Sequence, residues 1–286
     1  MPCSVQTVVE ARAHLGEGPA WDAARGCLYW VDVDRHEIHR YSESEGDQLV
    51  VTLDVPVGAV TPRADGGLLV AAGMGFATVD GDGRVSWIAT VDAGDRMNDG
   101  ACDPVGRFLA GTLKYDRSPG AALYRLDPDG TVVMLLKGVS VSNGLGWSPS
   151  GDRMYYIDTP TRRVDVFDYD VDDGSLGTRR VFAEIGDLPG NPDGLTVDAE
   201  GGVWVTLCRG RTVRRFTTDG KLDDVIELPT SRATSCTFGG PSLETLYITS
   251  GRFDLDNEQL RAEPLAGALF SCRPGVVGIP AVPFGG

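Results

Sequence analysis

The chain has 286 residues, of which 42% are apolar and 23% are charged, a composition that is ordinary for a folded protein with a sizeable core. Its formal net charge of -15 argues against nucleic acid or an anionic membrane surface as a partner, because both would repel it. No apolar run approaches the roughly 18 to 20 residues needed to cross a bilayer. Residues 1–19 also lack a basic start followed by an apolar run, so we predict no secretory signal and expect a cytoplasmic protein.

Six apolar segments follow one another along the chain, and each begins after a glycine-containing turn. The spacing of the segments is measured from one marker residue near the start of each: Leu28, Leu68, Phe108, Met154, Val203 and Leu246. These markers are 40, 40, 46, 49 and 43 residues apart. A period in this range, with short β-rich segments and almost no helical periodicity, is typical of a β-propeller.

The turns between the segments indicate hairpins. Stretches such as "DPDG", "DGDG", "DDGS" and "TTDG" combine side chains that cap turns with glycines that tolerate positive φ. Only residues 256–264, "DNEQLRAEP", resemble a short helical turn. The sequence therefore predicts an all-β protein, a single six-bladed β-propeller domain over residues 1–286 with four-stranded blades. We expect the ring to close by pairing of a strand in residues 4–13 with C-terminal strands, which protects an edge.

A polar residue stands just ahead of a glycine and an apolar stretch in four of the six repeats. It lies 10 or 11 residues before the marker of its repeat, and its identity changes: Glu17, Asn98, Asn143 and Asp193. The two remaining repeats place other residues there, namely Val57 and Gly58 in the second and Ser235 and Cys236 in the sixth. The innermost strand of each blade lines the central channel of a propeller. Two carboxylates and two amide oxygens are therefore expected to converge at the channel mouth.

Oxygen ligands of this kind suit a single divalent cation, with Ca²⁺, Mg²⁺, Mn²⁺ and Zn²⁺ all acceptable. Three or four protein ligands would leave coordination positions open to water and substrate, as in catalytic metal sites. The alternative is that these residues only form turns before glycine, as Asn-Gly and Asp-Gly commonly do. That alternative fits Glu17 poorly, because glutamate has little preference for turns.

The six cysteines are spread over the whole chain, at Cys3, Cys27, Cys102, Cys208, Cys236 and Cys272. No two of them form a Cys-x-x-Cys motif. Without a predicted secretory signal, we interpret them as reduced and mostly buried thiols.

The chain resembles the regucalcin/gluconolactonase family, also called the senescence-marker-protein family, over essentially its full length. The motifs that carry the resemblance are "LGEGP" at residues 15–19, "RMNDG" at 96–100, "SNGLGWS" at 142–148, "PDGLTVDAEGGVW" at 192–204 and "TSCTFGG" at 234–240. The resemblance implies a six-bladed propeller that hydrolyses sugar lactones. It also implies a divalent metal held by Glu17, Asn143 and Asp193.

The resemblance further implies that Arg96 and Asn98 bind the substrate. Some members carry a sugar-contacting glutamate in the loop after "AGT". Here that loop is shorter, and Asp116 is the nearest match, although Lys114 or Tyr115 could equally reach the pocket. The sugar preference is therefore open.

We expect Asp193 to act as the general base that activates water, because it is the only aspartate among the four converging residues. Two alternatives remain at this stage. One is hydrolysis of organophosphates or phosphotriesters at the same metal site. The other is a non-catalytic calcium-binding or ligand-binding propeller, in which the metal would be caged. The native metal, the particular sugar lactone and the oligomeric state do not follow from the sequence.

Overall fold

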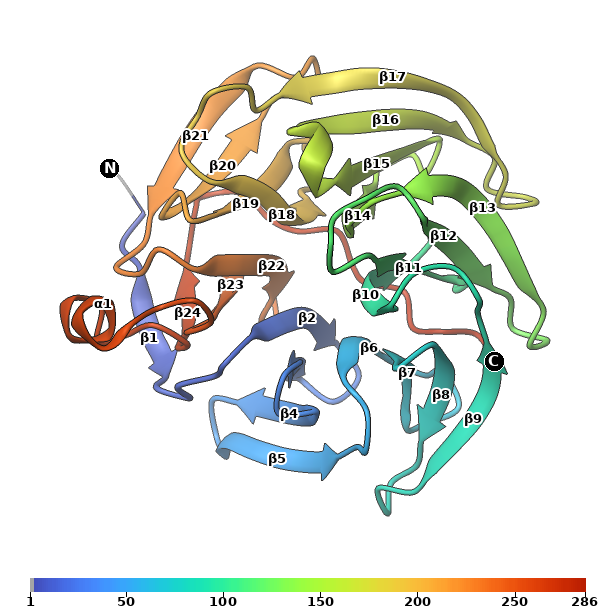
Figure 1. Cartoon of the computed structure of the whole chain (residues 1–286), viewed down its shortest axis with the longest axis horizontal. Helices are drawn as coiled ribbons and strands as arrows, with labels where there is room; N and C mark the ends of the chain where they lie inside the picture. Colours follow the sequence, from blue (N-terminus) through green and yellow to red (C-terminus); the bar gives the residue numbers. More distant parts are fainter. Residues whose placement is uncertain (1–2) are drawn as a thin grey trace.

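The computed structural model describes residues 3–286, which form six four-stranded antiparallel sheets arranged as blades around a central channel (Figure 1). This confirms the predicted six-bladed β-propeller. Each of the six sequence markers lies in the second strand of its blade, next to the innermost strand. The predicted repeat therefore has the frame of the observed blades.

The first three blades follow one another in chain order. Blade 1 consists of β2 (Gly16–Asp22), β3 (Cys27–Asp32), β4 (Glu37–Ser42) and β5 (Gly46–Thr52). Blade 2 consists of β6 (Val57–Pro62), β7 (Leu68–Ala72), β8 (Gly75–Val79) and β9 (Val85–Thr90). Blade 3 consists of β10 (Arg96–Cys102), β11 (Phe108–Leu113), β12 (Ala121–Leu126) and β13 (Val132–Val139).

Blades 4 and 5 continue the pattern, and a single 3-10 turn, η1 (Thr159–Thr161), lies between β15 and β16. Blade 4 consists of β14 (Ser142–Trp147), β15 (Arg153–Asp158), β16 (Arg163–Tyr169) and β17 (Leu176–Glu184). Blade 5 consists of β18 (Asn191–Val197), β19 (Val203–Cys208), β20 (Thr212–Phe216) and β21 (Leu222–Glu227).

The last blade joins the two ends of the chain. It consists of β22 (Ala233–Gly239), β23 (Thr245–Ser250), β24 (Leu269–Cys272) and, outermost, the N-terminal strand β1 (Gln6–Val9). β1 pairs antiparallel with β24, with Gln6 opposite Ser271. The predicted closure of the ring is thus confirmed, and it covers the outer edge of β24.

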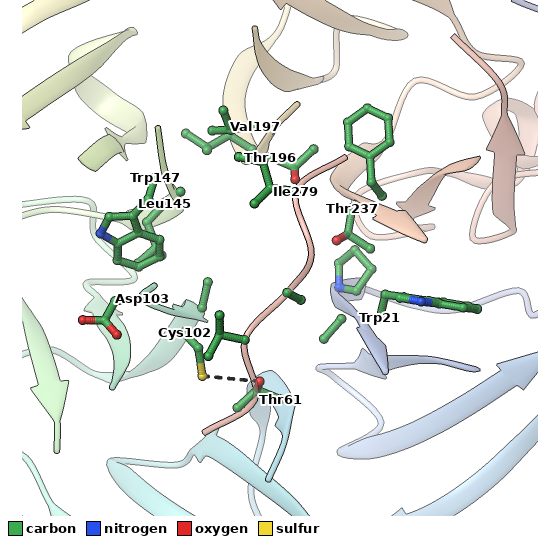
Figure 2. Close-up of a pocket in the computed structure, with 18 of the residues that line it drawn as sticks. Trp21, Thr61, Cys102, Asp103, Leu145, Trp147, Thr196, Val197, Thr237 and Ile279 are labelled. Carbon is green, nitrogen blue, oxygen red and sulfur yellow. Dashed lines mark hydrogen bonds between the residues drawn. The ribbon is translucent and has the colours of Figure 1, made fainter. Parts of the chain in front are cut away.

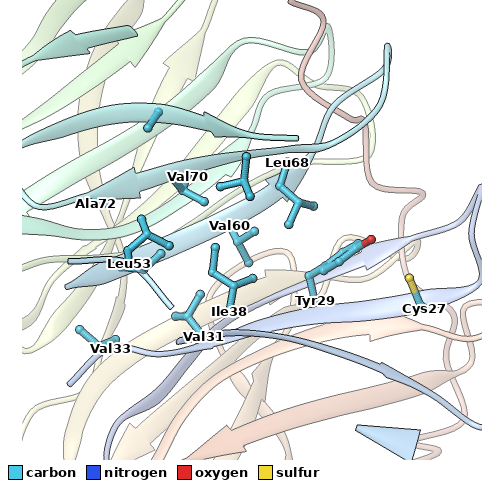
Figure 3. Packing of buried hydrophobic residues seen from close by; sticks show 13 residues of the cluster. Cys27, Tyr29, Val31, Val33, Ile38, Leu53, Val60, Leu68, Val70 and Ala72 are labelled. Atoms are coloured by element: carbon cyan, nitrogen blue, oxygen red, sulfur yellow. The ribbon is translucent and has the colours of Figure 1, made fainter. Parts of the chain in front are cut away.

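The core is divided into six apolar clusters, one at each junction between neighbouring blades. Figure 3 shows the cluster between blades 1 and 2, where Val31 and Ile38 face Val60 and Val70. Successive side chains of a strand point to opposite faces of its sheet, so each blade contributes residues to the clusters on both of its sides. Because every blade is held by its two neighbours, the ring positions the inner strands rigidly around the channel.

In the described part of the chain, α-helix is confined to one short segment, α1 (Asn257–Ala262), where the sequence predicts a helical turn. Asp256 caps it by accepting hydrogen bonds from the backbone N–H groups of Glu258 and Gln259. Within residues 3–286 no helix is long and apolar enough to cross a membrane.

All six inner strands share one irregularity. The antiparallel register with the second strand shifts near the start of each inner strand, between Glu17 and Ala20 in β2 and between Pro192 and Leu195 in β18. The same shift occurs in β6, β10, β14 and β22. A β-bulge re-aims the side chains around it, and bulges recur next to functional sites. Here the six bulges ring the channel at the level of the predicted site.

Candidate metal and substrate site in the channel

Several glycines at the level of the site, among them Gly58, Gly144 and Gly194, are required by the close approach of neighbouring inner strands. A Cβ on Gly144 of β14 would lie 2.4 Å from the backbone N of Leu195 and 2.8 Å from the carbonyl oxygen of Asp193. A Cβ on Gly58 would lie 2.2 Å from the carbonyl oxygen of Asn98. Such distances are far below van der Waals contact, so a larger residue would push the strands apart. The turn-only interpretation of these glycine pairs is therefore wrong, because they lie inside β-strands.

Two carboxylates, Glu17 of β2 and Asp193 of β18, lie close enough in the channel to repel each other, although blade 6 separates their two blades. Burial raises the pKa of Glu17 well above its usual range, and repulsion from Asp193 and then from Asp99 adds to this effect. Burial and repulsion from Asp99 raise the pKa of Asp193 to about 8, although contacts with the Cys208 thiol and the Asn143 side chain partly oppose the rise. Buried like charges without a cationic partner are unfavourable, so this pair favours a bound cation or a proton.

The amide of Asn143 is held in one orientation by a residue from the η1 turn. Its Nδ2 donates to the Thr159 hydroxyl at 2.8 Å, and that hydroxyl in turn donates to the carbonyl oxygen of Pro192 at 2.9 Å. Because the hydroxyl proton is committed to Pro192, the hydroxyl can only accept from Asn143. The amide nitrogen therefore points to Thr159, and the amide oxygen accepts from Asn98 Nδ2 at 3.2 Å with a second lone pair left for a cation.

Arg96 and Asn98 lie together on β10, beside Asn143. The Arg96 guanidinium donates to Asn98 Oδ1 at 2.8 Å, and Asn98 Nδ2 donates to the Ser142 carbonyl oxygen at 2.7 Å and to Asn143 Oδ1 at 3.2 Å. Asn98 is thus a bridge between the arginine and Asn143. Burial lowers the pKa of Arg96, while Tyr115 opposes that change.

The polar residues of the loop after β11 have different partners. Asp116 accepts hydrogen bonds from the backbone N and hydroxyl of Ser118 and is exposed. Lys114 forms an ion pair with Asp95 at 2.5 Å. Tyr115, whose exposed fraction is 69%, is the loop residue close enough to influence Arg96. A role of Asp116 in substrate binding therefore remains a proposal about the loaded protein.

The side chains at the channel mouth fit a divalent cation through a mixed set of oxygens. Within residues 3–286, no group of three or more His, Cys, Asp and Glu side chains has the arrangement of a metal site. A cation between Glu17 and Asp193 would therefore depend on the amide oxygen of Asn143 as its third protein ligand. Carboxylate and amide oxygens are hard ligands, which is the chemistry that Ca²⁺, Mg²⁺ and Mn²⁺ prefer.

Three further residues of this site were not predicted from the sequence. Asp99 is a third buried carboxyl group, and burial raises its pKa to about 6. Thr159 orients Asn143, and the Cys208 thiol lies against Asp193. The "NDG" motif contains Asp99, but the sequence alone did not indicate which of its two polar side chains would face the other carboxylates. The cysteines are free in the structure, and four of them are buried, as expected.

These features define a class, the six-bladed propeller whose channel carries a buried polar cluster of carboxylate and amide groups at one end. Comparison with known proteins specifies the family. Residues 15–252 match the model of the SMP-30/Gluconolactonase/LRE-like region. The chain belongs to this family, as its motifs suggest.

Relatives match over nearly the whole chain. Regucalcin of Danio rerio is 38% identical over 290 residues, covering 99% of this chain and 98% of the relative. Pentonolactonase XacC of Haloferax volcanii is 36% identical and covers 97% of both chains. Among solved structures, regucalcin from Agrobacterium tumefaciens, a calcium-binding protein, superimposes with a TM-score of 0.94 at 27% identity, covering 99% of this chain and 98% of that one.

Gly144→Ala should disturb the site by separating β14 from β18, since its Cβ would meet backbone atoms of the neighbouring strand. We expect a loss of about 1–3 kcal/mol in the free energy of unfolding, measured by urea denaturation, and weaker divalent-metal binding, measured by calorimetry. Gly146→Ala is the matched control, because its Cβ would meet only side-chain methyl groups of Leu195 and Val197, at 2.9 and 3.2 Å. Equal effects of the two substitutions would contradict the close-approach argument.

Thr159→Val should weaken metal binding, because the Asn143 amide loses the acceptor that fixes its orientation. Loss of such an orienting partner typically lowers metal affinity by about 10- to 100-fold. Thr159→Ser keeps the hydroxyl and should restore most of the affinity, again measured by calorimetry. An unchanged affinity in Thr159→Val would show that Asn143 does not need this hydrogen bond.

Proposed function

We propose that this protein is a divalent-metal-dependent lactonase that hydrolyses sugar lactones to aldonic acids. The observation that carries the proposal is the oriented amide of Asn143 beside Asp193, whose partly buried carboxyl group repels the buried carboxyl group of Glu17. Glu17, Asn143 and Asp193 would hold the cation. When bound, it would polarise the lactone carbonyl and stabilise the negative charge that develops on its oxygen.

The residues of the chain itself would bind the substrate and move the proton. Arg96 presents a buried guanidinium that can donate hydrogen bonds to the lactone or its hydroxyl groups, and Asn98 holds that guanidinium in place. Asn98 would bind the substrate through the remaining hydrogen-bonding capacity of its amide. Asp116 would have to leave Ser118 in order to reach the sugar.

Asp193 would act as the general base. Its carboxyl group is partly buried beside Asn143, and burial raises its pKa to about 8, a value that a bound cation would lower. It would take a proton from the attacking water and later return it to the ring oxygen as the carbon–oxygen bond breaks. Its proximity to Cys208 and Asn143 fixes the carboxyl group in the channel.

The relatives support this assignment and suggest the first substrates and metals to test. A pentonolactonase among them favours five-carbon sugar lactones, and a calcium-binding regucalcin favours Ca²⁺. A non-catalytic calcium-binding propeller is the second candidate, supported by the same calcium-binding protein. Metal-stripped protein should be screened with sugar lactones and a phosphotriester in a pH-indicator assay, with Ca²⁺, Mg²⁺, Mn²⁺ and Zn²⁺ added back singly. Lactone opening that requires an added cation supports the proposal, and no activity with any cation contradicts it.

Asp193→Asn keeps an oxygen ligand of nearly the same size but removes the base. We expect turnover of the lactone to fall by roughly 10²-fold or more, which is the usual scale for loss of a general base. Metal binding should remain measurable and weaker. If excess metal restores most of the rate, Asp193 serves only as a ligand.

Metal-free protein should lose stability as the pH rises from 5 to 8.5. The folded-state pKa of Asp193 is raised to about 8, so the folded protein binds this proton more tightly than the unfolded chain does. The resulting stabilisation is complete below the unfolded-state pKa of about 4 and is lost as the pH rises through the folded-state value. Added metal should therefore raise the melting temperature more at pH 8.5 than at pH 5.

The control for this measurement is Glu17→Gln/Asp193→Asn, which removes both titrating ligands. Its melting temperature should change less with pH than that of the metal-free wild type. Identical pH profiles of the two proteins would show that the carboxyl pair does not determine the pH dependence.

A further inference from the structure

A cavity lies in the channel next to the proposed lactone site. Its volume is about 450 Å³. Glu17, Asn143 and Asp193 lie near the starts of β2, β14 and β18, and the later residues of these strands line the cavity. Figure 2 shows the C-terminal segment crossing this cavity, with Ile279 beside it. The cavity therefore adjoins the proposed lactone site within one channel, and Asp99, which lines the cavity, is also close enough to Asp193 to raise its pKa.

The segment that crosses the cavity, residues 279–283, is anchored at both ends and free between them. The Gly278 N–H donates to the Leu243 carbonyl oxygen at 2.8 Å, and the N–H of the buried Phe284 donates to the Pro62 carbonyl oxygen at 2.9 Å. Among the described residues, no backbone–backbone hydrogen bond involves 279–283, and Pro280 and Pro283 have no N–H to donate. This strap covers the cavity only in part.

The walls of the cavity combine apolar and aromatic residues with uncharged serine and threonine side chains, and the described lining residues include no lysine, arginine or histidine. Trp21, Trp147 and Phe238 contribute rings from three different blades (Figure 2 labels the two tryptophans). An anionic ligand would find no positive partner here. Aromatic faces attract cations, and the apolar walls attract a hydrocarbon body.

Asp99 places a buried carboxyl group on the same cavity. Its exposed fraction is 9%, and one of its oxygens accepts a hydrogen bond from the Gly100 N–H at 2.7 Å. Among the described residues, no cationic side chain forms an ion pair with it. The other acidic residue of the lining, Asp103, is already satisfied by Arg107 at 2.6 Å and by the Tyr169 hydroxyl at 2.6 Å. Asp99 is thus the carboxyl group that lacks a partner.

We propose that this cavity binds a small organic cation, a primary ammonium group on an apolar or aromatic body. The ammonium group pairs with Asp99, and the body packs against Trp21, Trp147 and Phe238 under the strap. Burying an unpaired carboxylate is costly, and a cation of the ligand removes that cost. This step rests on the proposed function: if Glu17 and Asp193 hold one divalent cation, their two charges balance it, and the charge of Asp99 is left for this ligand. A cavity of this size accommodates a compact organic molecule.

Calorimetric titration of the metal-loaded protein with three probes of similar size tests the proposal: 2-phenylethylamine, 2-phenylethanol and phenylacetate. We expect one amine to bind per chain, the neutral alcohol to bind at least tenfold more weakly, and the anion not to bind. Asp99→Asn should abolish the preference for the amine. Asp129→Asn, which removes the same charge from an exposed turn, should leave it unchanged.

A second variant keeps the test valid if Asp99→Asn does not fold. Thr237 lines the cavity from β22, and Thr237→Phe would fill part of it without altering the Asp99 charge (Figure 2). Amine binding should be lost in this variant while the metal content is retained. Equal binding of amine and alcohol, or failure of the amine to bind at millimolar concentration, would overturn the proposal. So would displacement of the amine by a sugar lactone in the Asp99→Asn variant, which would place the amine in the lactone site itself.

Discussion

The close approach of neighbouring inner strands is the constraint on which the channel depends. At Gly58 and Gly144, backbone atoms of the next strand occupy the space that a Cβ would need. Each inner strand also carries a β-bulge at this level, which interrupts its regular pairing with the second strand. A bulge re-aims the side chains around it, so the polar residue there can face the channel. The pattern of a changing polar residue followed by glycine thus has two causes. Packing requires glycine at its position, because a larger residue would meet the neighbouring strand. The identity of the polar residue before it is not restricted in this way.

This geometry explains why an acidic protein can concentrate still more negative charge on its axis. Glu17, Asp99 and Asp193 repel one another in a buried space, and burial raises the pKa of each. The rigid ring of six apolar junctions holds them together despite that repulsion. A folded structure that holds like charges in place is preorganised for a cation, because the cost of bringing the ligands together is met during folding. The hydrogen bond from Asn143 to Thr159 completes this preorganisation by orienting an uncharged ligand.

The sequence predicted the blades, the closure by β1 and the equivalent repeat positions of the four polar residues. Each of these predictions follows from the spacing of residues along the chain. Thr159 could not be predicted in this way. It acts across a blade junction, on Asn143 of its own blade and on Pro192 of the next, and no spacing in the sequence reports such a contact. Asp99 was missed because its neighbour Asn98 occupies the repeat position, and the bulge decides where each side chain points. The position of Asp116 depends on a loop conformation that the repeat does not determine.

Metal content is the most direct measure of whether the starts of the inner strands form one cation site. Wild-type protein equilibrated with Ca²⁺ or Mn²⁺ and then desalted should retain one ion per chain in elemental analysis. The Glu17→Gln/Asn143→Ala double variant should retain none, while its circular dichroism and thermal transition still report a folded propeller. One tightly held ion at full occupancy in the folded double variant would contradict the account.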